Sequence, residues 1–264
     1  MKSHLVNQPV ALWPGHAAQL LREIRLEYLS PPAQQSLTDE WKPYEIVQGM
    51  AIVPVRGILV HETAWWGWGE TSYSSIARSI MTALQDNDVK TVALHINSPG
   101  GEVSGCFDLA DVLYDLRGEK PIVAVVDEMA FSAAYALACC ADEIYLPRTG
   151  GVGSVGVITM HLDITKMLEK SGILVTTVQY GDQKSDTYPT TPLSDDARAR
   201  LQADVDLMGE MFVNLVARGR GIRASEVRDT QAGCFLGDEA VNVGFADAVM
   251  SVEQAFLDII KKGN

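Results

Sequence analysis

Positive charge, cysteine and long apolar runs are all scarce in this sequence. Its 264 residues carry 21 Lys and Arg against 34 Asp and Glu, a formal net charge of -13. So acidic a surface repels phosphate groups, so we expect no nucleic-acid partner. No stretch reaches the roughly eighteen apolar residues that span a bilayer, so we expect no integral membrane segment.

The four cysteines are not spaced as metal ligands. None forms a Cys-x-x-Cys pair, and none has a histidine two to five residues away. Cys139 and Cys140 lie in an apolar run and are predicted to be buried thiols in a reducing compartment. The N-terminus lacks a clean apolar core followed by a cleavage site, so a cytoplasmic protein is expected. No metal or other cofactor is expected.

The chain is predicted to divide into an N-terminal preface, 1–45, and one α/β domain, 46–264. The preface holds a helical stretch, 17–28, which ends before Pro31 and Pro32 because proline cannot continue a helix. From Ile46 onward β-branched residues dominate, and strand-like and helix-like segments alternate. The expected strands are 89–97, 121–126, 143–146, 155–160 and 173–179, and the expected helices are 73–85, 103–116, 132–140, 164–170, 194–219 and 252–261.

The first segment with chemical potential is Asn97-Ser98-Pro99-Gly100-Gly101, directly after a predicted strand. Two glycines between a strand and a helix let backbone N–H groups point into open space, where they can stabilise an oxyanion. The same pattern also binds phosphates or simply turns the chain.

The second segment centres on Ser132, between a buried strand and an alanine-rich helix. A serine at such a turn can be a helix N-cap. It can also be an exposed nucleophile, with the N–H of Ala133 donating to the oxyanion.

The third segment is Gly150–Val157, which contains Ser154, followed later by Tyr180–Ser185, which contains Lys184. A serine needs a base to accept its proton, and the five histidines form no evident triad. A lysine can serve where burial lowers its pKa and a hydroxyl positions the neutral amine. A lone lysine in a loop is otherwise an ordinary surface charge.

Taken together, Ile96–Gly101, Phe131–Tyr135, Gly153–Val157 and the Gly-x-x-Lys at 181–184 resemble the signal-peptide-peptidase A family of serine peptidases. The resemblance covers about residues 46–250 and is closest to the lambda-type phage capsid assembly proteases. It implies a Clp/crotonase-like spiral of ββα units, a peptide substrate, a homo-oligomeric ring, and a place in the bacterial host cytoplasm or the phage procapsid.

The resemblance also implies the role of each site residue. Ser132 matches the nucleophile, Lys184 the general base and Ser154 the hydroxyl that orients the lysine. Gly101 together with Gly100, and the Ala133 N–H, match the oxyanion hole. In some members the serine and lysine come from neighbouring subunits. Two features depart from the pattern: Ala133-Ala134 replaces glycines, which predicts a tighter groove, and we expect no scaffold-like C-terminal extension after Asn264, which argues against a self-contained scaffold role.

Several alternatives stay open. His161 with Asp163 or Asp182 would make a Clp-type triad, while His95 is expected to be a sheet-face residue. A signal-peptide-degrading peptidase, a crotonase-like acyl-CoA enzyme and a non-catalytic assembly protein are other possibilities. The loop with Trp65, Trp66 and Trp68 is expected to lie in a subunit contact or beside the substrate.

Overall fold

The computed structural model describes residues 10–12, 42–62 and 69–263. The helix expected over 17–28 and the tryptophan loop lie outside these residues, and the division at residue 45 stays a prediction. Within the described part of the chain, no helix is long and apolar enough to cross a bilayer.

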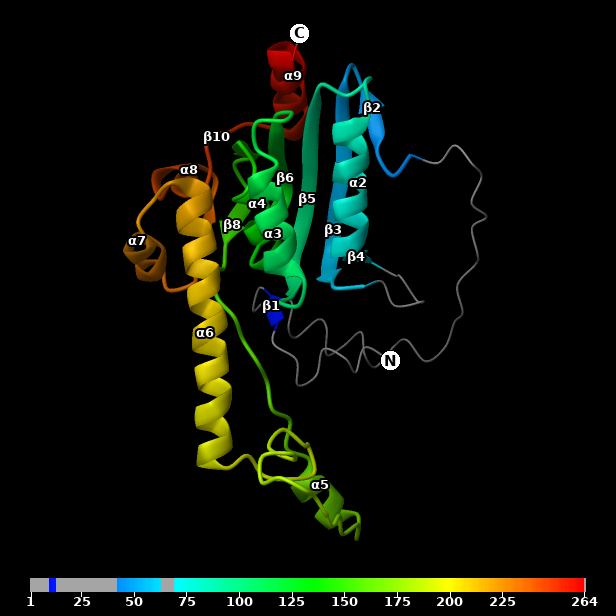
Figure 1. Ribbon diagram of the computed structural model, residues 1–264. Helices are drawn as coiled ribbons and strands as arrows, with labels where there is room; N and C mark the ends of the chain where they lie inside the picture. Colours follow the sequence, from blue (N-terminus) through cyan, green and yellow to red (C-terminus); the bar gives the residue numbers. More distant parts are fainter. Residues whose placement is uncertain (1–9, 13–41, 63–68, 264) are drawn as a thin grey trace.

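A twisted, mostly parallel sheet forms the centre of the molecule (Figure 1). Its main path runs β10-β7-β6-β5-β3-β2, in which β2 is antiparallel to β3 and the other neighbours are parallel. Three-residue β1 pairs with β5, β4 pairs with β3, and β8 pairs with both β6 and β9. The strands are β1 (Val10–Leu12), β2 (Glu45–Val47), β3 (Met50–Val60), β4 (Glu70–Ser72), β5 (Thr91–Glu102), β6 (Ile122–Phe131), β7 (Glu143–Leu146), β8 (Gly151–Gly153), β9 (Cys234–Leu236) and β10 (Ala248–Val249).

Helices cover both faces of the sheet, so its central strands are buried on two sides and consist mostly of apolar residues. One face packs against α2 and α4, and α3 and the C-terminal end of α6 pack on α4. The other face packs against α9 through Ala255 and Ile259. The helices are α2 (Tyr73–Gln85), α3 (Cys106–Asp115), α4 (Ala133–Ala138), α5 (Thr165–Lys170), α6 (Asp195–Arg220), α7 (Ala224–Asp229), α8 (Gly237–Asn242) and α9 (Val252–Gly263).

Helix α6 begins and ends where its sequence predicts. The Ser194 hydroxyl accepts a hydrogen bond from the Ala197 N–H, and Asp195 and Asp196 stand in the first turn, where negative charge is favoured. Gly221 ends the helix in the left-handed conformation, with φ 66°. At 1.5 Å per residue, its 26 residues extend about 39 Å.

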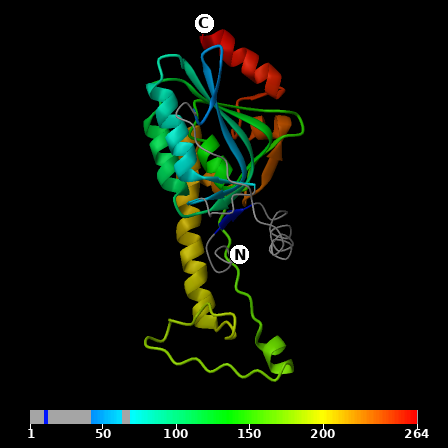
Figure 2. The same cartoon turned by 90° about the vertical axis from the view of Figure 1, so that its right-hand side faces the viewer.

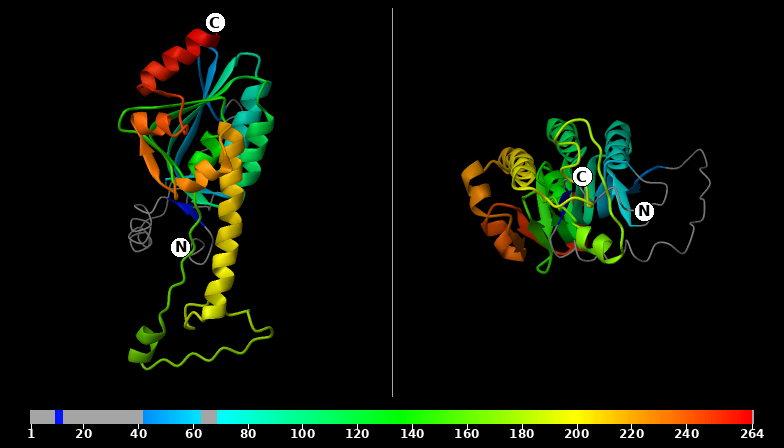
Figure 3. Two further views of the ribbon diagram at one scale, coloured as in Figure 1. Left: turned by 90° about the vertical axis from the view of Figure 1, so that its left-hand side faces the viewer. Right: turned by 90° about the horizontal axis from the view of Figure 1, so that it is seen from below.

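Only the C-terminal part of α6 packs against the rest of the fold, where it contacts α3 and α4. Its N-terminal part projects away together with α5 and the segments beside it, as all the side views agree (Figures 1, 2 and 3). We call residues 158–211 the arm, and residues 42–62, 69–157 and 212–263 the body. Among the described arm residues, Ala197 alone is buried.

The sequence predictions for the body are largely confirmed, since α2 and β7 have the expected bounds and the helices expected at 103–116 and 132–140 are present in shortened form. Two predicted strands are wrong. Residues 155–160 contain only an isolated bridge at Ile158, and 173–179 contain no strand. Every residue from 171 to 184 is exposed, and among the described residues this β-branched stretch has no neighbouring strand to pair with.

Candidate active site

Ser132 occupies a strained turn between β6 and α4. Its backbone has φ 55° and ψ -122°, a combination that a non-glycine residue adopts only when its surroundings impose it. Its Oγ is buried and has no hydrogen-bond partner among the described residues. The hydroxyl does not cap α4, so the N-cap alternative fails, and the strained backbone holds an unpartnered hydroxyl in place.

The strand β8 fixes the other side of this turn. The Ser132 N–H donates to the Gly153 carbonyl at 2.8 Å, and Phe131 registers with Gly153 in the parallel pair of β6 and β8. Ser154 follows at once. It is 5% exposed, and its backbone also has a positive φ, of 56°. The structure therefore brings the two predicted serines to neighbouring positions, both with backbone conformations that are uncommon for serine.

The Gly100-Gly101 segment is the C-terminal end of β5 and lies on the far side of the Ser132 turn from β8. Gly100 has φ 104°, and its N–H donates to the Ser98 hydroxyl at 3.1 Å. Gly101 approaches β3 so closely that a Cβ atom there would stand 1.8 Å from the Leu59 carbonyl oxygen. The Gly100 N–H is therefore already used, while Gly101 is paired with β3 and with β1.

Ala133 supplies the second candidate oxyanion donor. It is the first residue of α4, so its N–H has no intrahelical acceptor. Its carbonyl accepts the thiol of Cys106 at 3.7 Å, and burial raises the pKa of that thiol to about 12. Cys106 therefore stays protonated at neutral pH and is not a competing nucleophile beside Ser132.

The structure does not bring Lys184 to Ser132 within one chain. Lys184 is exposed and lies between α5 and α6, in the segment at the end of the arm farthest from the sheet (Figure 1). His161 belongs to the arm too, on the segment that leads from the body to α5. Among the described residues no hydrogen bond joins Ser132 to either candidate base, and both ring nitrogens of His161 are buried without a hydrogen-bond partner. His95, by contrast, is a sheet-face residue as expected, packed edge-on against Phe256.

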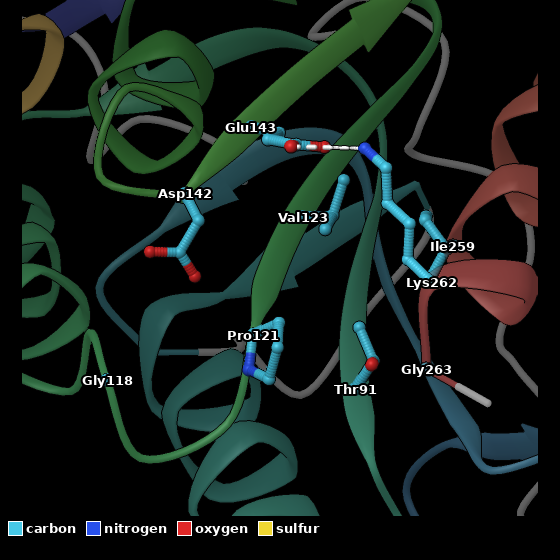
Figure 4. Close-up of a pocket in the computed structure, with 9 residues that line it drawn as sticks. All are labelled: Thr91, Gly118, Pro121, Val123, Asp142, Glu143, Ile259, Lys262 and Gly263. Atoms are coloured by element: carbon cyan, nitrogen blue, oxygen red, sulfur yellow. Dashed lines mark hydrogen bonds and ion pairs between the residues drawn. The ribbon is translucent and has the colours of Figure 1, made fainter.

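A second lysine stands beside a cavity, but at the wrong end of the sheet. The cavity, of about 420 Å³, is lined by residues at the start of β5, β6 and β7, whereas Ser132 follows the end of β6 (Figure 4). There Lys262 of α9 donates to Glu143 at 2.7 Å and to the Tyr145 hydroxyl at 2.7 Å. The Glu143 carboxylate raises the pKa of Lys262, which keeps its amine protonated and unsuited to act as a base.

Sequence reasoning missed two groups that shape this site. Ser98 is fully buried and its hydroxyl accepts the Gly100 N–H, a role that was not predicted when the Asn97–Gly101 segment was considered for oxyanion binding. Val10–Leu12 of the preface pairs with the Gly100–Glu102 end of β5. The prolines at 9 and 14, which bound this short apolar run, were the one available signal.

Comparisons with known proteins match this chain to two peptidase families and to phage proteins. The model of peptidase family S49 matches residues 115–263, and the Clp protease model matches residues 66–149. Head-tail preconnector protein GP5 of Enterobacteria phage P21 is 32% identical over 280 residues, covering 96% of this chain and 56% of its own length. Capsid assembly protease C of Escherichia phage lambda is 34% identical over 216 residues, covering 81% and 49%.

The fold is the Clp/crotonase-like α/β type. The Clp protease match over residues 66–149 includes β5, β6 and the turn that carries Ser132. Among solved structures, a ClpP1 mutant from Listeria monocytogenes aligns with a TM-score of 0.47 at 12% identity, over 76% of this chain and 91% of the other. The chain spans about half the length of the phage relatives it matches.

Proposed function

Because the chain belongs to peptidase family S49, we propose that it is a serine endopeptidase in which Ser132 is the nucleophile and Lys184 the general base. The observation that supports this most is the Ser132 turn itself. A strained backbone holds a buried hydroxyl without a partner between a glycine strand end and the Gly153-Ser154 pair. A structural serine in that position would be expected to use its hydroxyl in a hydrogen bond.

In the proposed mechanism the neutral amine of Lys184 takes the Ser132 Oγ proton, and Oγ attacks the scissile carbonyl carbon. The N–H groups of Gly101 and Ala133 stabilise the resulting oxyanion. When the tetrahedral intermediate collapses, the lysine ammonium returns the proton to the leaving amine. The neutral lysine then deprotonates a water, which hydrolyses the acyl-enzyme. Ser154 acts as a positioning residue whose hydroxyl holds the amine.

We further propose that Lys184 reaches the serine of a neighbouring copy. Two observations support this step: Lys184 is exposed at the distal end of the arm, and the arm is unusually apolar. Of the fifteen exposed large apolar side chains in the described residues, eleven lie on the arm. They are Met160, Leu162, Met167, Ile173, Leu174, Val175, Val178, Tyr180, Tyr188, Leu207 and Met211.

So large an apolar surface on one projecting segment is typical of a protein–protein interface. An arm that leaves its own body and docks on the next makes a head-to-tail contact, and repetition of such a contact closes a ring when the rotation permits. A homo-oligomeric ring is therefore the proposed working form. Each site would then combine the serine of one subunit with the lysine of the next.

For the substrate we propose a capsid or scaffold protein of a phage, cleaved during head assembly. The support is the similarity to a capsid assembly protease and a head-tail preconnector protein. Degradation of signal peptides is the second candidate, because the same peptide-bond cleavage can act on different protein substrates.

The test is covalent labelling with a fluorophosphonate probe, read by intact mass on the assembled protein. The variants are wild type, Ser132→Ala, Lys184→Ala and His161→Ala. We expect labelling to disappear in the first two variants and to persist in His161→Ala. Labelling lost in His161→Ala but kept in Lys184→Ala would replace the dyad with a histidine triad. Labelling that persists in Ser132→Ala would remove Ser132 from the mechanism.

A further inference from the structure

Strand β1 lies against the part of β5 that carries the proposed oxyanion donor. It pairs antiparallel with β5, in the register Val10 with Glu102, Ala11 with Gly101 and Leu12 with Gly100. An extended segment that adds antiparallel to an exposed strand edge is a common way for proteins to recognise peptides.

The edge that β1 occupies is the one that faces Ser132. Gly100 and Gly101 pair with Ile58 and Leu59 of β3 on one edge, so β1 takes the other. That other edge belongs to β6 as far as the pair Ser98 with Ala130. Two residues beyond Ala130, β6 turns into Ser132. β1 therefore pairs with the edge of β5 that β6 leaves free, beside the turn that carries Ser132.

The nucleophile is closed off in this arrangement. Ser132 has no exposed surface, so a substrate carbonyl can reach its Oγ only after a rearrangement. Among the elements that pair along β5, β1 is the shortest, with three residues against the longer pairings of β3 and β6. Pro9 and Pro14 flank it in the sequence and lack the N–H that would extend the pairing. Because β1 pairs with β5 over fewer residues than β3 or β6, its displacement breaks the fewest backbone hydrogen bonds.

We propose that Val10–Leu12 is a tethered competitor that occupies the substrate-strand edge at Gly100–Glu102 and closes the site until a substrate segment displaces it. The inference rests on the proposed function, because it assigns a regulator to the same site. The displacing substrate is an extended peptide segment that pairs with Gly100–Glu102 through its backbone. The competing reading is that β1 is a permanent strand of the fold.

The first test uses the rate of probe labelling at Ser132 in the assembled full-length chain. Ala11→Pro removes an N–H from the centre of the pairing, and Ala17→Pro places the same residue beyond it as a matched control. If β1 occupies the edge nine-tenths of the time, opening it raises the labelling rate about tenfold. A peptide with the sequence of residues 8–14, added in trans, should bring Ala11→Pro back to the wild-type rate, and a scrambled peptide should not. A properly folded Ala11→Pro that labels at the wild-type rate overturns the proposal.

The second test needs no substitution in β1 and no catalysis. Hydrogen exchange is measured on Ser132→Ala with and without the peptide of residues 8–14. The proposal expects the amides of Val10–Leu12 in the chain to lose protection when the peptide is present, while Gly100–Glu102 keep theirs. Unchanged protection of Val10–Leu12 at saturating peptide would make β1 a permanent strand. If no variant is labelled, the proposed peptidase function fails, yet this exchange experiment still decides whether β1 is displaced.

Discussion

The body and the arm of this chain treat their apolar residues in opposite ways. In the body, Tyr135, Phe212 and Phe245 are fully buried, and the Tyr135 ring stacks on Phe245 at 5.0 Å. In the arm, Leu174, Val178 and Tyr180 are at least 91% exposed. The body thus buries its large apolar side chains in its own core. The arm exposes such side chains, as a surface does that is buried only by a binding partner.

The same division separates the two halves of the proposed chemistry. Ser132, Ser154 and the glycine strand end belong to the body, where backbone strain and hydrogen bonds position them. Lys184 belongs to the arm. Under the proposed mechanism, the nucleophile is positioned when the chain folds and the base arrives only on assembly, so activity would depend on the oligomer.

The largest expected effect is at the body's nucleophile. Ser132→Ala should lower peptide cleavage by about 10⁴-fold or more, the scale seen when a catalytic nucleophile is removed. Alanine removes only the hydroxyl, which makes no hydrogen bond among the described residues, so the fold should be kept. The circular dichroism spectrum and the oligomeric state should therefore match those of the wild type. Peptide cleavage assayed on assembled protein checks this. A loss below tenfold would contradict Ser132 as nucleophile.

Lys184→Ala should reduce cleavage by about 10²–10⁴-fold, the range for a general base. The sharper result comes from mixing. When Ser132→Ala and Lys184→Ala subunits are dissociated together and reassembled, some interfaces join an intact serine to an intact lysine. Recovery of a measurable fraction of wild-type activity is expected if the arm serves its neighbour. No recovery, with exchange of subunits verified by mass, would return the lysine to its own subunit.

The pH profile should separate the two candidate bases. A lysine base works as the neutral amine, so kcat/KM should keep rising with pH through about pH 9. A histidine base would level off above its ordinary pKa of about 6.5. A plateau from pH 7 upward in wild type would favour His161 over Lys184. The Lys184→Arg variant serves as the control, since it keeps the charge but cannot act as the base.

Substitutions of buried apolar residues in the body should lower the free energy of unfolding far more than substitutions of exposed residues in the arm. Phe212→Ala removes a fully buried ring from the body and should lower the free energy of unfolding by about 3–5 kcal/mol. Urea titration of both proteins at one concentration measures the difference. A loss under 1 kcal/mol would mean that the end of α6 is not part of the core.

Substitutions of exposed apolar residues in the arm should have the smallest effect on folding. Their effect on assembly should be large. Leu174→Ser and Val178→Ser change side chains that are 91% and 94% exposed, so denaturation of the separated chain should shift by less than about 0.5 kcal/mol. Sedimentation should nevertheless show smaller assemblies, and cleavage should fall with them. Met81→Ser, an exposed apolar position of the body, is the matched control. If all three variants formed assemblies of the same size, the arm would not be part of the interface.

The predictions from sequence were best where structure depends on neighbours along the chain. Ser72 and Ser194 begin α2 and α6, and Gly221 ends α6, because capping involves residues within one or two turns. They failed at 155–160 and 173–179, where β-branched residues suggested strands. A strand also needs a partner strand, and the exposed segment 171–184 has none in the part of the chain that the structure describes.

By itself, the sequence determined the alternation of strands and helices, the position of the serine turn and the motif order that identifies the family. These follow from periodicity, caps and residue chemistry, which are local. The tertiary structure alone decided that Ser132 and Ser154 are neighbours, that Lys184 stands apart from both, and that Val10–Leu12 lies against Gly100–Glu102. Such contacts join residues tens of positions apart, and their formation depends on how the whole sheet is ordered and packed.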